Sequence, residues 1–403
     1  MSSMVTNTQQ DYYGEMLQAA PEGERLKLCL ECGTCSGICP FGYLMVYPPS
    51  RLIAALRADR FARVLDTDAL WMCVSCSACT SFCPSKIPLT AGLMARTKEE
   101  LLLQGNVPSE LQDALSNSQR YGNPLGESPR KRSEWASGLV PEVKVLAKVK
   151  EPVDVLWFVG DYGSYHPRVR ETSKALATIL SVLGVNFGIL GPEESSDGDS
   201  QRLAGERGLF EMLAEKNAKA FGKYQFNTII TADPHAFNAL KNEYPRLGIE
   251  YPVQHYTEFL AERLDQLRPL LKRELKKRVT YHDACYLGRV NGIFDQPRLL
   301  LQAVPGLELV EMTHTHSNSL CCGGGGGGMW LDGFQWEKAH IRLSELRVQE
   351  ALEAKADMLA VACPYETPRF EDAAKTTAGA AGLQVRDISE ILAESFDAQR
   401  GGK

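Results

Sequence analysis

The sequence lacks any apolar run of the ~18 to 20 residues that a helix needs to cross a bilayer. The best candidate, 175–190, is interrupted by polar residues and a glycine, which indicates a buried helix followed by a strand. Residues 1–11 also lack the basic start and apolar core of a secretory signal. Because cytoplasmic proteins keep their thiols reduced, we expect a cytoplasmic protein with no membrane segment of its own.

The sequence also lacks an excess of basic charge, the many cysteines of a disulfide scaffold, and nucleotide-binding motifs. The formal net charge of -6 argues against a nucleic-acid-binding surface, which is usually strongly basic. Twelve cysteines among 403 residues are too few for a disulfide scaffold. No G-x-G-x-x-G follows a predicted strand, and the glycine run Gly323–Gly328 lacks the Lys-Ser or Lys-Thr ending of a P-loop. A two-electron donor such as NADH must therefore be oxidised on a partner protein.

Eight of the cysteines form two runs with the same spacing, C-x2-C-x2-C-x3-C-P. This is the pattern of bacterial ferredoxins, in which the fourth cysteine of each run ligates the cluster of the other run. Zinc is the alternative, but zinc sites take their ligands in separated pairs. We therefore predict two [4Fe–4S] clusters, one held by Cys29, Cys32, Cys35 and Cys83 and the other by Cys73, Cys76, Cys79 and Cys39.

Around these runs the sequence predicts a helical ferredoxin-type domain, with helices over 50–65 and 89–103 and Ser50 as an N-cap. A stretch rich in Ser, Pro, Asn and Gly follows, and its basic cluster at 130–132 is typical of solvated surface. The expected organisation is a flexible arm (1–21), the ferredoxin-type domain (22–104), a linker (105–150), two α/β lobes (151–277 and 278–396) and a tail (397–403).

From residue 153 onward, short apolar strands alternate with helices, which predicts parallel α/β sheets. The fold class is therefore α/β, with an N-terminal helical dicluster ferredoxin-like domain and a two-lobed, internally duplicated α/β domain. Strands are expected over 153–160, 185–190, 228–231, 278–281, 308–311 and 358–361, and helices over 168–183, 201–221, 236–244, 257–275, 296–304 and 334–355.

Four further cysteines follow predicted strands or lie beside the glycine run of the second lobe: Cys285, Cys321, Cys322 and Cys363. The carboxyl ends of parallel strands meet at one edge of a sheet, where such folds bind ligands. The glycine run leaves room for the backbone to approach an inorganic core. The alternatives are a third iron–sulfur cluster and relic cysteines in a structural domain, and we favour the cluster.

The two ferredoxin runs, the Cys321-Cys322-Gly323 block and the Ala362-Cys363-Pro364 segment together resemble the D-type subunits of heterodisulfide reductases. Relatives in this family include the iron–sulfur subunits of glycolate and lactate oxidases, and the resemblance covers residues 22–395. In the heterodisulfide reductases both lobes carry a full cysteine set and noncubane [4Fe–4S] clusters that cleave a disulfide. Here the first lobe is degenerate, with Asp161, Ser196, Asp197, Asp233 and Ala236 where cysteines are expected, and Glu366 takes the last cysteine position of the second lobe.

The resemblance implies a third [4Fe–4S] cluster held by the four remaining cysteines. It is either a cubane with Glu366 as a candidate extra oxygen ligand, or a noncubane cluster short of one thiolate. His282 is a candidate hydrogen-bond donor to a cluster sulfur, although a scaffold role is commoner. In the degenerate lobe, His235 and His255 are expected to be structural.

The predicted function is an iron–sulfur electron-transfer component of a cytoplasmic oxidoreductase complex. Single electrons would pass between a flavin-containing oxidoreductase or electron-transfer flavoprotein, or a ferredoxin-type partner, and a terminal partner such as a membrane quinone-linked protein. The alternative is a catalytic thiol:disulfide (heterodisulfide) reductase, against which Glu366 and the degenerate first lobe count.

Overall fold

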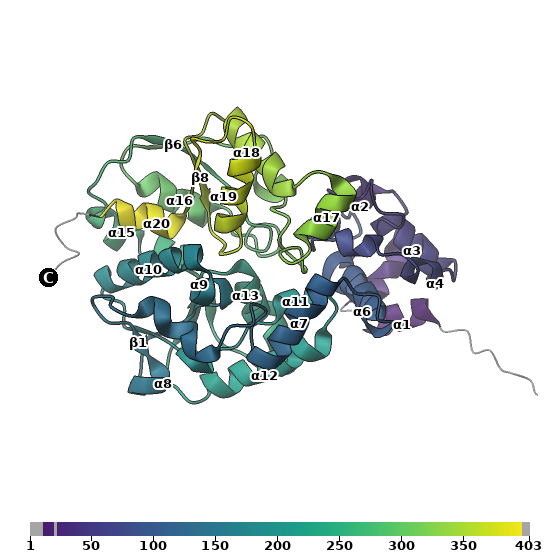
Figure 1. Ribbon diagram of the computed structural model, residues 1–403, viewed down its shortest axis with the longest axis horizontal. Helices are drawn as coiled ribbons and strands as arrows, with labels where there is room; N and C mark the ends of the chain where they lie inside the picture. Colours follow the sequence, from purple (N-terminus) through teal and green to yellow (C-terminus); the bar gives the residue numbers. More distant parts are fainter. Residues whose placement is uncertain (1–10, 20–21, 397–403) are drawn as a thin grey trace, which may run out of the picture.

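The computed structural model describes residues 11–19 and 22–396, so the predicted tail 397–403 and residues 1–10 and 20–21 of the predicted arm lie outside the described residues. The N-terminal part is helical and forms one end of the molecule (Figure 1). Its buried core includes Leu52, Phe61, Trp71 and Leu101. Its α-helices are α1 (Tyr12–Ala19), α2 (Thr34–Gly37), α3 (Pro49–Arg57), α4 (Ala62–Leu65), α5 (Ala78–Ser81), α6 (Ala95–Leu103) and α7 (Ser109–Tyr121).

Two predictions for this part differ from the structure. The segment 12–19 of the predicted flexible arm is helix α1, because Met16 is buried in the domain core and Tyr12 lies against Phe61 with ring centroids 4.8 Å apart. The helix predicted over 50–65 is divided into α3 and α4, and α3 begins at Pro49 after an N-cap at Pro48. Ser50 is not the cap, because its hydroxyl instead pairs with that of Ser36 at 2.6 Å.

The first lobe is built on a five-stranded parallel sheet with the order β1-β3-β2-β4-β5. The central strand β2 is buried along its whole length, as its unbroken apolar sequence requires. The strands are β1 (Lys144–Val145), β2 (Val155–Phe158), β3 (Phe187–Ile189), β4 (Thr228–Thr231) and β5 (Val253–His255). The helices are α8 (Leu146–Val149), α9 (Asp161–Tyr165), α10 (Pro167–Val182), α11 (Asp199–Leu203), α12 (Arg207–Phe221), α13 (Pro234–Asn238), α14 (Tyr256–Ala261) and α15 (Leu264–Leu267).

The second lobe repeats this architecture with a four-stranded parallel sheet of order β7-β6-β8-β9. The order matches β3-β2-β4-β5 strand for strand, so the internal duplication predicted from the sequence is present in the topology. The strands are β6 (Lys277–Tyr281), β7 (Leu307–Leu309), β8 (Met358–Val361) and β9 (Gln384–Asp387). The helices are α16 (Asp295–Ala303), α17 (Asp332–Ala339), α18 (Leu343–Glu353), α19 (Glu366–Thr376) and α20 (Ile388–Glu394).

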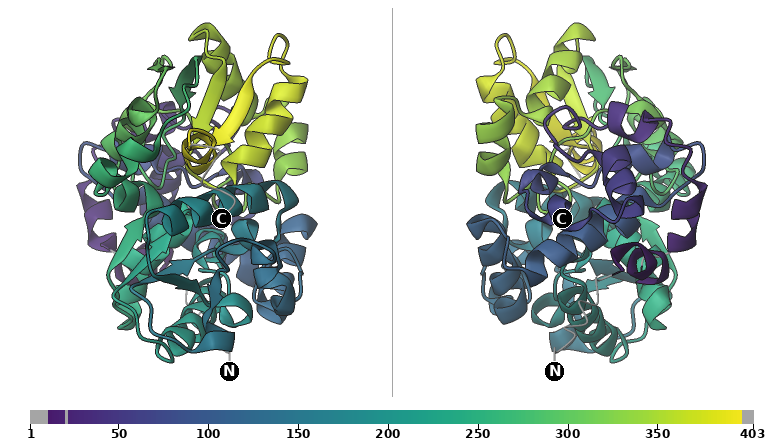
Figure 2. Two further views of the ribbon diagram at one scale, coloured as in Figure 1. Left: turned by 90° about the vertical axis from the view of Figure 1, so that its left-hand side faces the viewer. Right: turned by 90° about the vertical axis from the view of Figure 1, so that its right-hand side faces the viewer.

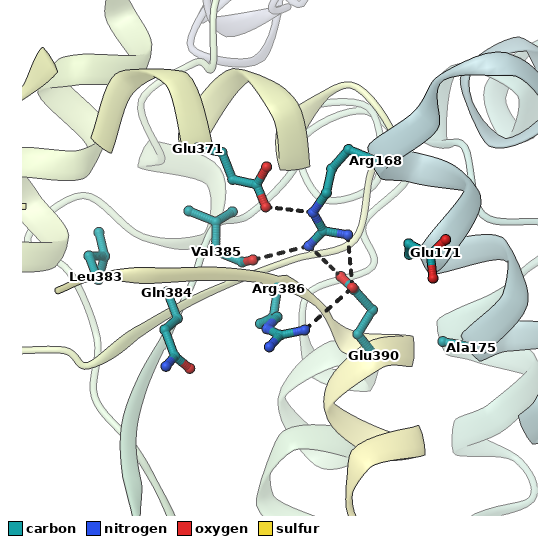
Figure 3. Close-up of a pocket in the computed structure, with 9 residues that line it drawn as sticks. All are labelled: Arg168, Glu171, Ala175, Glu371, Leu383, Gln384, Val385, Arg386 and Glu390. Atoms are coloured by element: carbon teal, nitrogen blue, oxygen red, sulfur yellow. Dashed lines mark hydrogen bonds and ion pairs between the residues drawn. The ribbon is translucent and has the colours of Figure 1, made fainter. Parts of the chain in front are cut away.

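The two lobes stack on one another and share a continuous hydrophobic core (Figures 1 and 2). Helix α10 of the first lobe packs on α20 of the second, and α14 packs on α16. The Tyr256 hydroxyl donates to Asp387 Oδ1 across this interface at 2.9 Å. Figure 3 shows a second contact, in which Arg168 of α10 pairs with Glu371 of α19 and Glu390 of α20. The lobes therefore form one body.

Three helices predicted as continuous in the lobes are shorter or broken. The helix over 201–221 is divided because Gly205 has φ +100° and a side chain there would meet the backbone of α6, 2.5 Å from Glu99 N. The helix over 334–355 divides into α17 and α18 at His340, which has φ +50°. The helix over 257–275 is divided into the shorter helices α14 and α15. Strands β1, β5 and β9 were not predicted.

The predicted linker 105–150 is ordered structure that lies on its neighbours. Helix α7 places Leu111 and Leu115 in the core of the ferredoxin-type domain. In the basic cluster, Arg130 and Lys131 are exposed, but Arg132 is 2% exposed. The prediction of solvated surface is therefore wrong for Arg132, because its guanidinium pairs with two buried carboxylates of the first lobe, as described below.

Within the part of the chain that the structure describes, none of the helices has the length and apolar character of a membrane span.

Candidate functional site

The eight ferredoxin cysteines lie on and around two short helical turns, α2 and α5, which contain Cys35 and Cys79 and pack against each other. The pKa of Cys39 is raised by burial and then by the charges of Cys73, Cys76 and Cys79. Burial also raises the pKa of Cys35, with added contributions from Cys29 and Cys83. Cys39 thus lies near the first three cysteines of the second run, and Cys83 lies near Cys35 of the first run.

The backbone of each run contains left-handed turns between its cysteines. In the first run, Glu31 and Gly33 have φ +55° and +78°, and in the second Ser75 and Ser77 have φ +51° and +60°. Left-handed residues in such turns direct amide groups inward, and concavities of this kind bind anions and iron–sulfur clusters. The amide of Glu31 lies 3.4 Å from Cys29 Sγ, as this geometry requires.

Hydroxyl groups complete the surroundings of both runs. Thr34 Oγ1 lies 3.3 Å from Cys32 Sγ, and Thr90 Oγ1 lies 3.4 Å from Cys79 Sγ. Thr90 comes from the π-helical turn Leu89–Met94 that precedes α6. The sequence analysis missed both threonines, although Thr34 stands between two cysteines of the first run and could have been found there.

The four remaining cysteines also converge. Hydrogen bonds to the thiols of Cys285, Cys322 and Cys76 raise the pKa of Cys321 well above its ordinary value. Cys363, two residues after β8, is close enough to Cys322 for the two to interact electrostatically. The amides of Gly323 and Gly324 donate to Cys321 Sγ and Cys322 Sγ at 3.2 and 3.4 Å. Convergent sulfurs with amide donors are a donor set that suits an iron–sulfur cluster.

The second ferredoxin run touches this cysteine group directly. A hydrogen bond from the Cys321 thiol lowers the pKa of Cys76 to about 6, although burial opposes it. Arg289 donates to the Cys76 carbonyl at 2.7 Å, and the ammonium of Lys98 donates to the carbonyls of Cys73 and Gly326 at 2.8 and 3.0 Å. Cations thus lie between two thiol-rich groups. None of these cations was found from the sequence, because their partners are more than 20 residues away.

The glycine run has a role that the sequence analysis did not predict. A side chain at Gly326 would lie 2.1 Å from Ser75 Oγ, and one at Gly325 would lie 2.8 Å from the Val74 carbonyl. Absence of side chains there lets the second lobe approach the ferredoxin loop. The sequence analysis expected the glycine backbone to lie close to the cysteine group. Gly324 does so, since an added Cβ there would lie 3.6 Å from Cys322 Sγ.

Beside Cys322, the side chains of His282 and Glu366 form a buried group with ligand atoms within 4.8 Å of one another. His282 Nε2 lies 3.2 Å from Glu366 Oε1. Burial raises the pKa of Glu366 to about 7. The candidate extra ligand predicted from the sequence therefore lies next to the cysteine group.

In the first lobe, the positions that lack cysteine form a buried polar core. Asp161, Ser196, Asp197, Asp233 and Ala236 are each no more than 3% exposed. Arg132 donates to Asp161 Oδ1 at 2.7 Å and to Glu194 Oε1 at 2.8 Å. The Asp233 carboxylate caps α13 by accepting from the His235 amide at 2.8 Å. Carboxylates engaged in this way do not supply the thiolates that a second disulfide-cleaving centre would need.

Both histidines of this lobe are held by hydrogen bonds. His235 Nδ1 pairs with Asp199 Oδ2 at 2.8 Å, and although burial opposes it this contact raises the His235 pKa to about 9. Burial lowers the pKa of His255 to about 3, and its Nδ1 lies 2.8 Å from the Thr257 hydroxyl. Both contacts agree with the structural roles expected for these residues.

Comparison with known proteins gives two domain families. A 4Fe-4S dicluster domain matches residues 24–87, and a cysteine-rich domain matches twice, over 155–241 and 279–365. The second match falls on the lobe with four cysteines and the first on the degenerate lobe. The two lobes are therefore recognisable as copies of one domain even though cysteines remain in only one of them.

Several curated proteins are similar to this chain. A probable iron-sulfur-binding oxidoreductase, FadF, of Bacillus subtilis is 36% identical over 301 residues, which is 73% of this chain and 42% of that protein. An EtfAB:quinone oxidoreductase of Syntrophomonas wolfei is 33% identical over 83% of this chain and 47% of its own length. The D-type subunit of the dihydromethanophenazine:CoB--CoM heterodisulfide reductase of Methanosarcina barkeri is 31% identical over 69% of this chain and 66% of its own length. The chain thus spans about half the length of the first two relatives.

Proposed function

The chain belongs to the family of iron–sulfur proteins that includes the D-type subunits of heterodisulfide reductases, and from this premise we propose that it relays single electrons within an oxidoreductase complex. The relatives are named as oxidoreductases or as subunits of oxidoreductase complexes. The cytoplasmic location expected from the sequence remains a prediction.

The proposal includes three [4Fe–4S] clusters. Two would be held crosswise by the ferredoxin runs, and the third by the cysteines of the second lobe. Support for the first two comes from the position of Cys39 beside the second run and of Cys83 beside the first. Support for the third comes from four converging cysteines with amide donors to two of their sulfurs. Bound clusters of this type supply one-electron chemistry, with potentials set by charge, hydrogen bonds and exposure.

The observation that carries the relay is that Cys76 and Cys321 pack in one buried cluster, where their thiols are hydrogen-bonded to each other. This contact joins the second ferredoxin run to the cysteine group of the second lobe without any intervening residue. Cys32 of the first run is exposed, whereas Cys321 and Cys363 are buried. We therefore order the route from the exposed first run, through the second run, to the buried lobe.

Three cationic side chains of this chain lie beside the cysteine groups along the proposed electron route. Lys98 and Arg289 donate to carbonyls of the second run, and Arg369 donates to the Cys322 carbonyl at 2.7 Å. Positive charge at these carbonyls favours the extra negative charge that each cluster would gain on reduction. The hydrogen bonds also hold the two cysteine groups at a fixed separation.

We propose that the redox partner docks at the first run. Five large apolar side chains flank the ferredoxin cysteines in the sequence and are at least 36% exposed: Leu28, Leu30, Tyr43, Val46 and Phe82. Exposed apolar side chains beside an exposed ligand suit a protein partner that must bring its own redox group close. A flavoprotein suits this role, because the chain lacks a dinucleotide fingerprint. The two electrons of a donor such as NADH must therefore be separated into single electrons on the partner.

The test uses the full chain prepared without oxygen. Visible absorption should bleach with dithionite and should not bleach with NADH until an electron-transfer flavoprotein is added. Iron analysis should give about twelve irons per chain, the content of three [4Fe–4S] clusters, and about eight for Cys321→Ser. Rapid bleaching by NADH alone, or an iron content that Cys321→Ser leaves unchanged, would contradict the relay or its third cluster.

A further inference from the structure

Glu366 enters the cysteine group from the first turn of α19, three residues after Cys363. Its side chain, that of His282 and the Cys322 thiol offer three ligand atoms that all lie within 4.8 Å of one another. Glu366 and His282 are each 1% exposed. A buried carboxylate beside sulfur ligands is costly unless it is paired, hydrogen-bonded or bound to a metal.

One oxygen of this carboxylate is accounted for and the other is not. Oε1 lies 3.2 Å from His282 Nε2, whereas Oε2 is buried and has no hydrogen-bond partner among the described residues. A buried polar atom without a partner needs an explanation such as an ion or a water molecule. Here the unpartnered atom belongs to a group that includes a candidate cluster ligand.

The hydrogen bonds of His282 show which side chain is free to bind a metal. Arg347 Nε donates to His282 Nδ1 at 3.0 Å, so Nδ1 is an acceptor and the ring proton is on Nε2. Nε2 then faces Glu366 Oε1 at 3.2 Å, and the ring also shares a hydrogen bond with the Cys322 thiol. Both ring nitrogens are engaged, so His282 orients the carboxylate and does not itself bind iron.

The degenerate lobe provides an internal comparison. Asp233 corresponds to Cys363 and Ala236 to Glu366, because β4 corresponds to β8 and each pair is separated by two residues. The lobe without cysteines therefore has an alanine at this position, fully buried at 0% exposure. At this position, a ligand-type side chain occurs only in the lobe that has sulfur ligands.

We infer that Glu366 binds, through Oε2, the iron next to Cys322 in the third cluster, with His282 as the positioning residue. The inference rests on the proposed function, because it presupposes that cluster. An oxygen lone pair forms the new bond to iron, and the oxidation state of the iron does not change. A carboxylate is a harder ligand than a thiolate, so the iron that it binds is chemically distinct from the others.

Mössbauer spectroscopy of the full chain, loaded with iron-57 without oxygen, tests this ligand. Wild type should show one iron in about twelve with the larger isomer shift of oxygen ligation. Glu366→Gln should lose this component, and Glu366→Cys should convert it to sulfur ligation. The matched control is Glu371→Gln on the same helix, which removes the same charge but points to Arg168 outside the cysteine group (Figure 3), and should leave the component intact.

His282→Ala tests the positioning role by the same signature. It should reduce the oxygen-ligated component while the iron content stays at that of wild type. A wild-type spectrum with about twelve irons that are all sulfur-ligated would overturn the inference and leave the third cluster standing. About eight irons would overturn the third cluster and the inference together. If Glu366→Gln does not fold, the oxygen-ligated component is compared between wild type and Glu366→Cys, and its presence in both would contradict the inference.

Discussion

At the residue scale, two threonine hydroxyls lie beside cysteine sulfurs, where they can change the reduction potentials of the proposed ferredoxin clusters. The Thr90 amide donates to Thr80 Oγ1 at 3.0 Å, and the two hydroxyl oxygens lie 3.1 Å apart. The Thr80 hydroxyl, accepting from that amide, can donate to Thr90 Oγ1. The Thr90 hydroxyl is then left to donate to Cys79 Sγ, 3.4 Å away. A donor at sulfur stabilises the reduced cluster, which carries more negative charge.

Thr90→Val should therefore lower the potential of the second ferredoxin cluster. The loss of one hydrogen bond, about 0.5 to 1.5 kcal/mol, corresponds to roughly 20 to 60 mV for one electron. Thr34→Val is the matched variant, because Thr34 lies 3.3 Å from Cys32 and should affect the first cluster alone. Titration followed by EPR measures both potentials. Potentials that do not change in either variant would show that these hydroxyls do not donate to sulfur.

The buried carboxylates of the first lobe predict a dependence of stability on pH. Burial raises the pKa of Asp233 to about 6, whereas an aspartate in an unfolded chain ionises near pH 3.9. Between these values the folded chain holds a proton that the unfolded chain has released. The free energy of unfolding therefore falls as pH rises, and this contribution is lost above about pH 6.

Asp233→Asn removes the titrating group and keeps an oxygen to cap α13. Relative to wild type, its free energy of unfolding should rise by roughly 1 to 1.5 kcal/mol between pH 5 and pH 7.5. Denaturation followed by tryptophan fluorescence at both pH values measures the difference, since Trp157 lies in the core of this lobe. A difference that is the same at both values would mean that Asp233 ionises normally.

At the scale of elements, the short helical segment Pro129–Ala136 fastens the ordered linker to the first lobe. Arg132 and its partners Asp161 and Glu194 are all buried. Removal of one partner from such a group leaves uncompensated charge in the interior and typically costs about 3 to 5 kcal/mol. The neighbouring Lys131 pairs with Glu127 at the exposed surface, where such pairs contribute about 0 to 1 kcal/mol.

Arg132→Met should therefore lower the free energy of unfolding of the first lobe by about 3 to 5 kcal/mol. Lys131→Met removes the same charge one residue away and should change it by less than about 1 kcal/mol. Urea unfolding monitored by Trp135 and Trp157, which pack edge to face, reports on this lobe. Equal losses in the two variants would show that the buried ion pairs do not stabilise it.

At the scale of the whole molecule, the junction between the ferredoxin-type domain and the second lobe depends on close backbone contact. Gly326 has φ +57°, and an added Cβ would lie 2.1 Å from Ser75 Oγ. Gly333, on α17 of the same lobe, has no atom within 4 Å of its added Cβ. Lys98 links the same two parts through carbonyls of Cys73 and Gly326.

Gly326→Ala should destabilise this junction by about 1 to 3 kcal/mol, because of overpacking and a left-handed backbone. Gly333→Ala should be nearly neutral. Thermal unfolding of the iron-loaded chain measures stability, and stopped-flow reduction by dithionite measures how fast the proposed cluster of the second lobe is reduced. If Gly326→Ala matched Gly333→Ala in both measurements, close approach at Gly326 would not be needed.

Patterns within short stretches of the sequence determined the ferredoxin-type turns, the central strands and the duplication of this protein. The spacing of the two cysteine runs predicts ferredoxin-type turns, since neighbouring residues decide the local backbone. Strands such as β4 and β8 have the predicted bounds because an unbroken apolar, β-branched run is suited to a buried parallel strand. The duplication was visible as well, because the same order of strands and landmark residues occurs twice.

Contacts between distant segments were decided only by the tertiary structure. The sequence around Arg132 is that of exposed surface, and its burial depends on Asp161 and Glu194, 29 and 62 residues away. Gly205 interrupts a predicted helix because α6 of another domain lies against it. The Cys76–Cys321 contact joins residues from separate domains. Local patterns record propensity and periodicity, whereas burial and charge pairing depend on which surfaces meet when the chain folds.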